Sequence, residues 1–217
     1  TGVQTCALPI SPIPAQLAGK VRGNCPSFIT KTDQERIQNI FKYRDDFLGR
    51  EYEVTLKLDG SSMTVYFNND HVGVCSRNLE LEETEDNAFW KVARSTNIID
   101  ALKAYGNNIA IQGELMGPGV QNNREGLKEL RLYIFDVFNI DTHEYLNYSD
   151  RMQIIDALTE FGCKADIAPI IGFKTIDAFD TVEKFLDYAD SIPSITHPIA
   201  EGVVFKNTTG KRHSFKV

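Results

Sequence analysis

The sequence predicts an α+β fold in which antiparallel sheets are flanked by helices. Segments with strand character outnumber helical ones, and they follow one another instead of alternating strictly with helices. This order does not favour a doubly wound parallel sheet. With 42% hydrophobic and 24% charged residues, the 217-residue chain can bury a full core. Its length fits one domain, or one domain with a small extra piece.

The first 26 residues are expected to lie outside that core. Residues 1–10, TGVQTCALPI, have no helical or strand period and no basic region of a signal peptide. Their reverse translation matches a widely used sequencing adapter, so we expect them to be non-native. Residues 11–26 are rich in proline and glycine and are expected to be a linker. The folded domain is therefore predicted at residues 27–217, truncated at both ends, because the chain stops inside an apolar run.

The first predicted elements of this domain are one helix and three strands. Residues 32–43 are expected to be helical, because Thr32 and Glu35 have capping-box spacing and apolar residues then recur on one face. Residues 51–67 alternate and are rich in β-branched and aromatic side chains, which predicts strand, turn and strand with a DG dipeptide as the break. Another short strand is expected at residues 72–76.

The middle of the chain is predicted to contain two helices and two strands. Residues 85–105 carry apolar side chains roughly at helical spacing. Strands are expected at residues 108–115 and 130–140, and the second is apolar enough to be buried. Residues 149–161 form an amphipathic pattern that begins with Ser149 as the expected cap.

The C-terminal part is predicted to add a helix at residues 181–189 and a terminal pair of strands at residues 202–206 and 213–217. No internal repeat or low-complexity tract interrupts the pattern.

Composition excludes several classes of function. The net charge of −7 argues against a broadly basic face for nucleic acid, although a local basic groove remains compatible with it. The four cysteines show neither CxxC spacing nor an accompanying histidine cluster, so no zinc site is expected. Scattered cysteines favour a reducing cytoplasm. No apolar run approaches the ~18 residues of a membrane span, so we expect a soluble chain without a membrane partner.

Six short motifs contain candidate chemical groups, and each also has an ordinary structural explanation. Lys57 of KLDG is either a lysine at a strand end or a nucleophile, which would need a pKa lowered by its surroundings. Arg77 of SRN either caps a loop or binds a phosphate with two hydrogen bonds. Glu114 of GEL either ends a surface strand or accepts hydrogen bonds from ribose hydroxyls.

The remaining motifs lie in the second half of the chain. Phe135 alone is most simply a core residue, whereas a buried Asp136 needs a partner to offset its desolvation. Glu201 and Lys206 of EGVVFK would face opposite sides of a regular strand, and they reach one site only if the strand ends or bulges within the motif. Lys216 stands at the chain end.

Together and in this order, the motifs resemble those of a known superfamily. KLDG, SRN, GEL, YIFD, EGVVFK and SFK are similar to motifs I, Ia, III, IIIa, IV and V of the covalent nucleotidyltransferases, which include DNA ligases, RNA ligases and mRNA capping enzymes. The flanking segments PSFITKTDQERIQN, LKLDGSSMTVY and ELEETEDNAFWKVAR resemble RNA ligases of the Deinococcus type, which are related to phage T4 RNA ligase 2. The resemblance covers nearly all of residues 26–217. It implies a nucleotide cleft between two antiparallel sheets flanked by helices.

The resemblance also implies a reaction, cofactors and partners. Lys57 would attack the α-phosphate of ATP, release pyrophosphate and hold AMP as a phosphoramidate. AMP would then move to the 5′-phosphate of an RNA strand, and a 3′-hydroxyl would displace it. Implied cofactors are ATP and Mg²⁺ or Mn²⁺, and implied partners are RNA ends or a nicked duplex. A cytoplasmic monomer is expected.

Roles follow from the resemblance residue by residue. Glu201 would help to bind the metal, and Lys206 would contact the AMP phosphate. Arg77 and Glu114 would face phosphate and ribose, and Phe135 would stack on the adenine.

The positive charges near the chain end and on the surface complete this set. Lys216 would neutralise the ATP phosphates during the first step. Arg94 and Lys211 are the candidates for contact with RNA, although each is more usually a solvated surface charge.

Three departures from the family pattern matter. Ser214 occupies the position of the first of two lysines in motif V, which leaves Lys216 without its usual neighbour unless Lys211 or Arg212 takes its place. Leu56 precedes the nucleophile where many relatives carry an acidic residue that recognises the adenine amino group. The clade also carries an N-terminal module, expected to assist the first step and the sealing of nicks, which is not found in this sequence.

Three alternatives differ from an ATP-dependent RNA ligase. A capping-type guanylyltransferase shares the KxDG core and would accept GTP. A DNA ligase would join DNA strands, and the motifs do not distinguish an RNA substrate from a DNA substrate. A catalytically inactive nucleic-acid-binding fragment would keep the fold, but it would have no need for Lys57, Glu114, Glu201 and Lys206 together.

Overall fold

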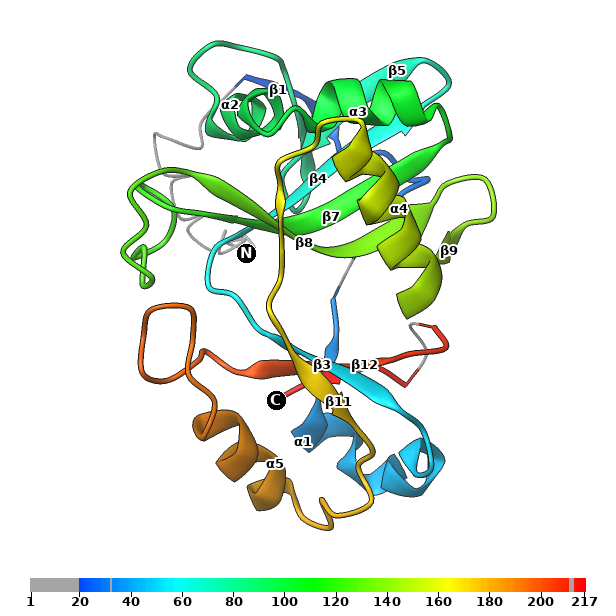
Figure 1. The fold of residues 1–217 in the computed structure, drawn as a ribbon, viewed down its shortest axis with the longest axis vertical. Helices are drawn as coiled ribbons and strands as arrows, with labels where there is room; N and C mark the ends of the chain where they lie inside the picture. The colour runs from blue at the N-terminus through cyan, green and yellow to red at the C-terminus, as the bar shows by residue number, and fades with distance from the viewer. Residues whose placement is uncertain (1–19, 32, 211–212) are drawn as a thin grey trace, which may run out of the picture.

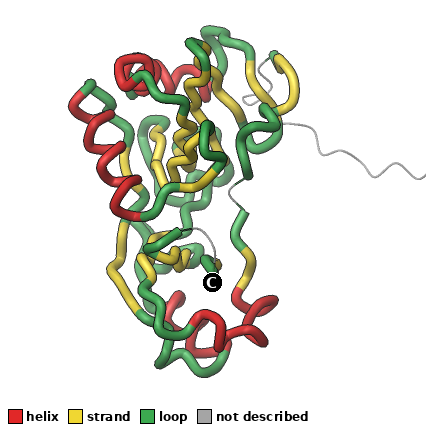
Figure 2. The backbone as a smooth tube through the Cα atoms, turned by 90° about the vertical axis from the view of Figure 1, so that its right-hand side faces the viewer, coloured by secondary structure: helices red, strands yellow, loops and turns green. Residues whose placement is uncertain are grey.

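The structure, a computed structural model, describes residues 20–31, 33–210 and 213–217. Predictions for the adapter-like segment, for most of the linker, and for Thr32 and Lys211 therefore lie outside the described residues. In the described part, two sheets face each other, and the helices lie mainly on their outer sides (Figure 1). Figure 2, turned by a quarter, shows helices at the two far ends of the molecule and one long helix along the side of its upper part. The α+β prediction with two mainly antiparallel sheets is confirmed.

The larger sheet, sheet A, has eight strands in the order β1-β6-β5-β4-β7-β8-β10, with β9 also paired to β8. All of its pairs are antiparallel except β8 with β10. Its strands are β1 (Val21–Asn24), β4 (Ser61–Asn68), β5 (His71–Cys75), β6 (Leu79–Leu81), β7 (Ile109–Met116), β8 (Arg131–Asn139), β9 (Glu144–Tyr145) and β10 (Asp166–Ile167). Its helices are α2 (Ala88–Ser95), α3 (Ile98–Tyr105) and α4 (Tyr148–Glu160).

The smaller sheet, sheet B, has five strands in the order β11-β3-β12-β13-β2. Only β13 and β2 pair in parallel. The strands are β2 (Glu35–Arg36), β3 (Tyr52–Leu56), β11 (Ile170–Lys174), β12 (Val203–Asn207) and β13 (Phe215–Lys216). The accompanying helices are α1 (Ile37–Ile40), the 3₁₀ helix η1 (Phe41–Phe47) and α5 (Val182–Asp190). The predicted terminal strand pair is thus present as β12 and β13.

Strand alternation decides which face of each sheet is apolar. On β4, Met63 and Val65 join the core formed with α2, α3 and α4. On β12, Val203 and Phe205 join the core formed with α1 and α5. On the other face of sheet A, Tyr66, Ala110 and Phe138 pack with Ile29 of the N-terminal segment. Other residues of the two sheets, among them Glu114 and Lys206, line a cavity between them.

The DG dipeptide is not a hairpin turn, because β3 and β4 belong to different sheets. The segment between them crosses from sheet B to sheet A and passes so close to β7 that a Cβ on Gly60 would lie 2.3 Å from the carbonyl oxygen of Leu115. Glycine is therefore required where the chain changes sheets.

Helix boundaries differ from the predictions at three places. Glu35 lies in β2, paired in parallel with Phe215 at the edge of sheet B, so the first helix begins only at Ile37 and lacks a side-chain cap. The predicted helix at residues 85–105 is two helices, because Asn97 adopts a left-handed conformation with φ of 56° between them. Asn147, and not Ser149, caps α4 by accepting a hydrogen bond from the Asp150 backbone N–H at 2.9 Å.

Several short strands were not predicted. β1 lies within the segment expected to be a linker, and β2, β6, β9 and β10 each have only two or three residues. Such strands are too short to show alternation, and their place is set by pairing partners that are distant in the sequence.

Candidate active site

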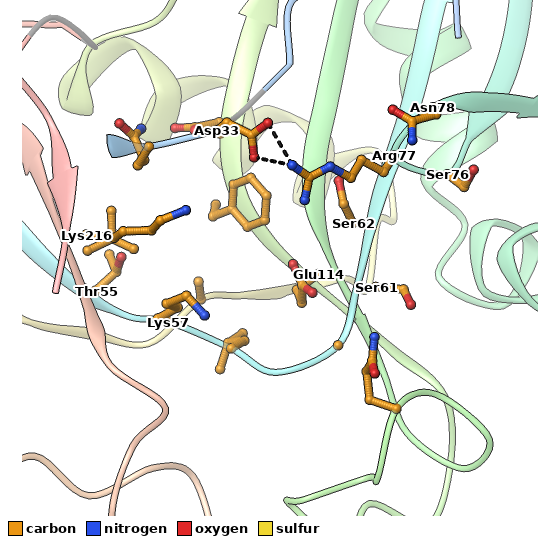
Figure 3. A pocket seen from close by; sticks show the side chains of 18 of the residues that line it. Asp33, Thr55, Lys57, Ser61, Ser62, Ser76, Arg77, Asn78, Glu114 and Lys216 are labelled. Carbon is orange, nitrogen blue, oxygen red and sulfur yellow. Dashed lines mark hydrogen bonds and ion pairs between the residues drawn. The ribbon is translucent and has the colours of Figure 1, made fainter. Parts of the chain in front are cut away.

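A cavity of about 620 Å³ lies between the two sheets. Sheet B contributes residues from β3, β12 and β13, and sheet A contributes residues from β4, β7 and β8. Figure 3 shows side chains from both sides pointing into the same space. The predicted site residues that line it are Lys57, Arg77, Glu114, Phe135, Lys206 and Lys216.

Lys57 directly follows β3, at the start of the segment that crosses between the sheets. Its backbone N–H donates to the Gly202 carbonyl oxygen at 3.0 Å, which ties it to the residue after Glu201. Its Nζ forms an ion pair with the Glu201 carboxylate. Both side chains are about one third exposed, at 31% and 34%, and Lys57 lines the cavity, whereas Glu201 lies beside it outside the lining.

Glu201 reaches Lys57 because β12 begins only at Val203. The strand therefore ends inside the EGVVFK motif, which is one of the two conditions under which Glu201 and Lys206 can serve one site. Gly202 adds a second constraint: a Cβ there would lie 2.2 Å from the Val217 carbonyl oxygen. The close approach of the last residue to this turn thus depends on glycine.

Glu114 lies on β7 opposite Ser62 of β4, on the face of sheet A that has no helix. Burial raises the pKa of its carboxyl to about 7, against the lowering effects of a hydrogen bond from the Gly60 backbone N–H and of the Lys57 charge. The charges of Glu201 and Asp59 also raise this pKa, which places three carboxylates in one electrostatic environment around Lys57.

A β-bulge places Phe135 and Asp136 together. On β8, Asp136 pairs with Gln112 and Ile134 pairs with Gly113, so Phe135 has no partner in the ladder. In a regular strand these neighbours would face opposite sides, but both line the cavity. The sequence pattern had made Phe135 alone a core residue. In the structure its ring is half-buried against the cluster of Leu56 and Tyr133, and the Lys206 Nζ lies 5.5 Å from the ring centroid.

Lys206 joins the two sheets. Its Nζ donates to the Phe135 carbonyl oxygen and, at 2.9 Å, to the Asp136 carboxylate. Burial lowers the pKa of the Lys206 ammonium, and the Asp136 charge opposes that change. Asp136 therefore has the partner that its burial requires.

A second buried ion pair extends this contact. Arg151 of α4 pairs with Glu53 of β3, and its Nη1 lies 3.9 Å from the Asp136 carboxylate. The side chains of Arg151 and Glu53 are only 5% and 2% exposed. Neither Arg151 nor Glu53 was predicted as a site residue. The one indication in the sequence was Glu53 itself, a single acidic residue inside the otherwise apolar strand YEVTL.

Arg77 is held at the side of the cavity by Asp33. Its Nη2 donates to both carboxylate oxygens of Asp33, each at 2.8 Å (Figure 3). The two side chains are 63% and 56% exposed, so a phosphate in the cavity can compete for the guanidinium. Asp33 was not predicted as a site residue, because it lies 44 positions from Arg77 in a segment expected to be helical.

The other charged candidates divide into two groups. Lys216 lines the cavity from β13. Arg94 lies on α2, outside the cavity, and pairs with Glu83 at 2.9 Å.

Two residues that depart from the family pattern also lie near the site. Ser214 accepts a hydrogen bond from the Asn207 backbone N–H at 3.0 Å. Leu56 is buried in the cavity wall.

The carboxylates fit a divalent cation that is shared with a phosphate ligand. Among the described residues, no group of three or more side chains is arranged to hold a metal by itself. Mg²⁺ is usually bound by one or two carboxylates together with substrate phosphates and water. Glu201 and Glu114, which interact beside Lys57, match that kind of donor set.

The site thus places the Lys57 amine close to acidic side chains and to further cations around one cavity. The amine can serve as a nucleophile once it loses its proton. Arg77, Lys206 and Lys216 supply positive charge on the cavity walls, as a bound polyphosphate requires.

No helix in the described ranges is long and apolar enough to cross a membrane. The described cysteines, Cys25, Cys75 and Cys163, are free thiols.

The fold is similar to that of solved RNA ligase structures. A Naegleria gruberi RNA ligase structure with PPi aligns with a TM-score of 0.89 and 42% identity, covering 96% of this chain and 61% of that chain. A variant of the same ligase with ATP and Mn aligns with a TM-score of 0.90 and 41% identity, covering 96% and 61%. A variant with AMP and Mn aligns with a TM-score of 0.89 and 41% identity, covering 95% of this chain and 60% of that chain. The chain therefore spans about three fifths of these relatives.

A search of curated proteins finds no match. The model of the RNA ligase family matches residues 50–217, the segment that contains both Lys57 and Lys216. The chain belongs to the RNA ligase family.

Proposed function

We propose that this protein is an ATP-dependent RNA ligase that joins 3′-hydroxyl and 5′-phosphate ends through a lysyl-AMP intermediate. The observation that carries the proposal is the position of Lys57 at the cavity wall, paired with Glu201 and near Glu114. Family membership and the similarity to a ligase with ATP and Mn support the choice of nucleotide and cofactor.

The first step would form a bond between the Lys57 Nζ and the α-phosphorus of ATP and break the bond to pyrophosphate. Lys57 must first lose a proton, and the Glu201 carboxylate that pairs with it is the nearest acceptor. Mg²⁺ or Mn²⁺, held by Glu201, would neutralise negative charge on the phosphate oxygens. AMP is a better leaving group than hydroxide, so its transfer to a 5′-phosphate makes the final displacement easier.

The other cavity residues would bind and orient the nucleotide. Lys206 would contact the AMP phosphate from its place between the two sheets, and Lys216 would neutralise the ATP phosphates. The Arg77 guanidinium would break its hydrogen bonds with Asp33 and bind a phosphate in their place. Glu114 would accept from ribose hydroxyls, and Phe135 would stack on the adenine.

Further assignments are part of the same proposal. RNA ends or a nicked duplex are the proposed partners, with Arg94 and Lys211 as contacts. We infer a cytoplasmic monomer of the Deinococcus-type clade, whose N-terminal module assists sealing. Its ligase domain occupies residues 27–217 together with β1, which pairs with β6 of sheet A although it lies inside the segment expected to be a linker. The free thiols of the described cysteines agree with a reducing compartment.

The test is retention of a labelled nucleotide by the denatured protein. The chain would be incubated with Mg²⁺ or Mn²⁺ and with ATP or GTP labelled at the α-phosphate. We expect label from ATP and none from GTP. Label from GTP alone would support a capping-type guanylyltransferase, and RNA binding without label from either nucleotide would support a non-enzymatic fragment. Nicked duplexes with RNA or DNA at the 3′-hydroxyl would then separate RNA joining from DNA joining.

A further inference from the structure

The loop that precedes Glu201 is held by hydrogen bonds between its own residues. Residues 192–200, here the delivery loop, connect α5 to the turn before β12. The Ala200 backbone N–H donates to the Ile192 carbonyl oxygen at 2.9 Å, and the Ser194 N–H donates to the His197 carbonyl oxygen at 2.9 Å. Because Glu201 directly follows Ala200, the position of this loop sets the position of the Glu201 carboxylate.

A second loop, from sheet A, faces the delivery loop. Residues 117–127, here the anchor loop, follow β7 and are tied by their own hydrogen bonds. Asn123 accepts from the Leu127 backbone N–H and donates to the Leu127 carbonyl oxygen, both at 3.0 Å. In Figure 1 the two loops meet at the left of the view, the anchor loop in green and the delivery loop in orange. The anchor loop is therefore a firm support for its neighbour.

Glu125 of the anchor loop is bound almost entirely by the delivery loop. It is 6% exposed. Its carboxylate accepts from the Ser194 hydroxyl, from the Thr196 backbone N–H at 2.7 Å and from the Thr196 hydroxyl at 2.9 Å. The Thr196 hydroxyl also lies 2.7 Å from the Glu125 carbonyl oxygen. Although burial raises its pKa, these hydrogen bonds and one from the His197 N–H lower the pKa of Glu125 overall, so it is ionised at neutral pH.

Arg124 adds a contact at the end of the delivery loop nearest Glu201. Its guanidinium donates to the Ile199 carbonyl oxygen at 2.7 Å and lies 3.2 Å from the His197 Nδ1. The next residue, Ala200, packs with Leu56 and Leu58, which flank Lys57. The anchor loop thus holds the delivery loop two residues before Glu201, and its own Gln121 lines the cavity.

We propose that Glu125 is a positioning residue for lysine adenylylation: it fixes the delivery loop across the two sheets and so holds the Glu201 carboxylate beside Lys57. The inference rests on the proposed function, because it assigns Glu125 a role in that reaction. Glu125 acts through Glu201 and does not contact the nucleotide.

Two measurements on the full chain test this role. The first is hydrogen exchange at the Ala200 amide, which is bonded to Ile192 and does not contact Glu125. The second is the single-turnover rate constant for label transfer from ATP, measured separately from the fraction of protein labelled. A purely structural role would lower the labelled fraction, whereas a misplaced Glu201 lowers the rate constant. Arg44→Met is the control, since Arg44 ties the Phe179 and Asp177 carbonyl oxygens away from the cavity.

For Glu125→Ala we expect faster exchange at Ala200 and a rate constant lowered by about 10- to 100-fold, as displaced catalytic groups produce. The ATP KM should change little. Glu125→Gln, which keeps an acceptor for Thr196, should recover part of the rate. Arg44→Met should leave the rate constant unchanged. If Glu125→Ala does not fold, Ser194→Ala removes one donor to the same carboxylate and should lower the rate in the same sense.

The failures are distinguishable. An unchanged Ala200 exchange rate, or an unchanged labelling rate constant despite faster exchange, would overturn the role of Glu125. A parent chain that takes up no label while Glu125→Ala still speeds Ala200 exchange would overturn the proposed function and leave Glu125 as a support of the loop alone, which also refutes its role in the reaction.

Discussion

Replacement of Glu114 by glutamine should make the protein more stable at neutral pH and change its dependence on pH. Burial raises the pKa of Glu114 from 4.5 to about 7. Between these values the folded chain binds a proton that the unfolded chain has released. The contribution of the protonated Glu114 carboxyl to the free energy of unfolding is therefore fully present below pH 4.5 and is lost as pH rises through 7. The shift corresponds to a loss of about 3 kcal/mol, most of it between pH 5 and pH 8.

Glu114→Gln has no carboxyl to ionise and keeps an oxygen that can accept from the Gly60 backbone N–H. The free energy of unfolding of the variant relative to the parent should therefore rise by about 2 to 3 kcal/mol from pH 5 to pH 8. Urea unfolding followed by the fluorescence of Trp90, the single and buried tryptophan, measures it. Glu82→Gln, at an exposed position, controls for the lost negative charge. A difference between variant and parent that is the same at both pH values would refute the reasoning.

Three further changes test other parts of the structure. Arg151→Met should lower the free energy of unfolding in urea by about 3 to 5 kcal/mol, because Glu53 would stay buried without its partner, and adding Glu53→Gln should recover much of that loss. Gly60→Ala should lower the melting temperature, since a Cβ would lie 2.3 Å from the Leu115 carbonyl oxygen; an unchanged value would mean that the crossing segment yields easily. Asp33→Asn should change unfolding by less than ~1 kcal/mol, because the pair is exposed, yet tighten ATP binding by freeing Arg77, and weaker binding in a titration would show that Asp33 instead orients the guanidinium.

The sequence predicted most of the long elements because their patterns are local. The pattern of β4 and the apolar run of β8 appear directly in residues 61–68 and 131–139. The break between α2 and α3 at Asn97 could not be predicted, because an asparagine marks a left-handed residue less clearly than a glycine or proline marks the end of a helix. The start of the first helix was wrong because the pairing of Glu35 with Phe215, 180 residues later, overrides a local capping pattern.

The candidate site shows the same division. Ordered motifs identified Lys57, Glu114, Glu201 and Lys206, because their chemistry is carried by the residue types themselves. The bulge at Phe135 was not predictable, since it depends on the register of β8 against β7. Likewise, only the folded chain brings Asp33 to Arg77, or Glu125 to Ser194, because these pairs form between distant segments.

The proposed reaction requires Lys57 to carry AMP, and mass spectrometry tests this requirement directly. The intact chain would be weighed after incubation with ATP and Mg²⁺ or Mn²⁺, then digested to locate the modification, with Lys57→Ala treated in parallel. We expect a gain of one AMP, located on the peptide that contains Lys57 and absent from the variant. An adduct on another residue, or an equal gain in Lys57→Ala, would contradict the assignment of the nucleophile.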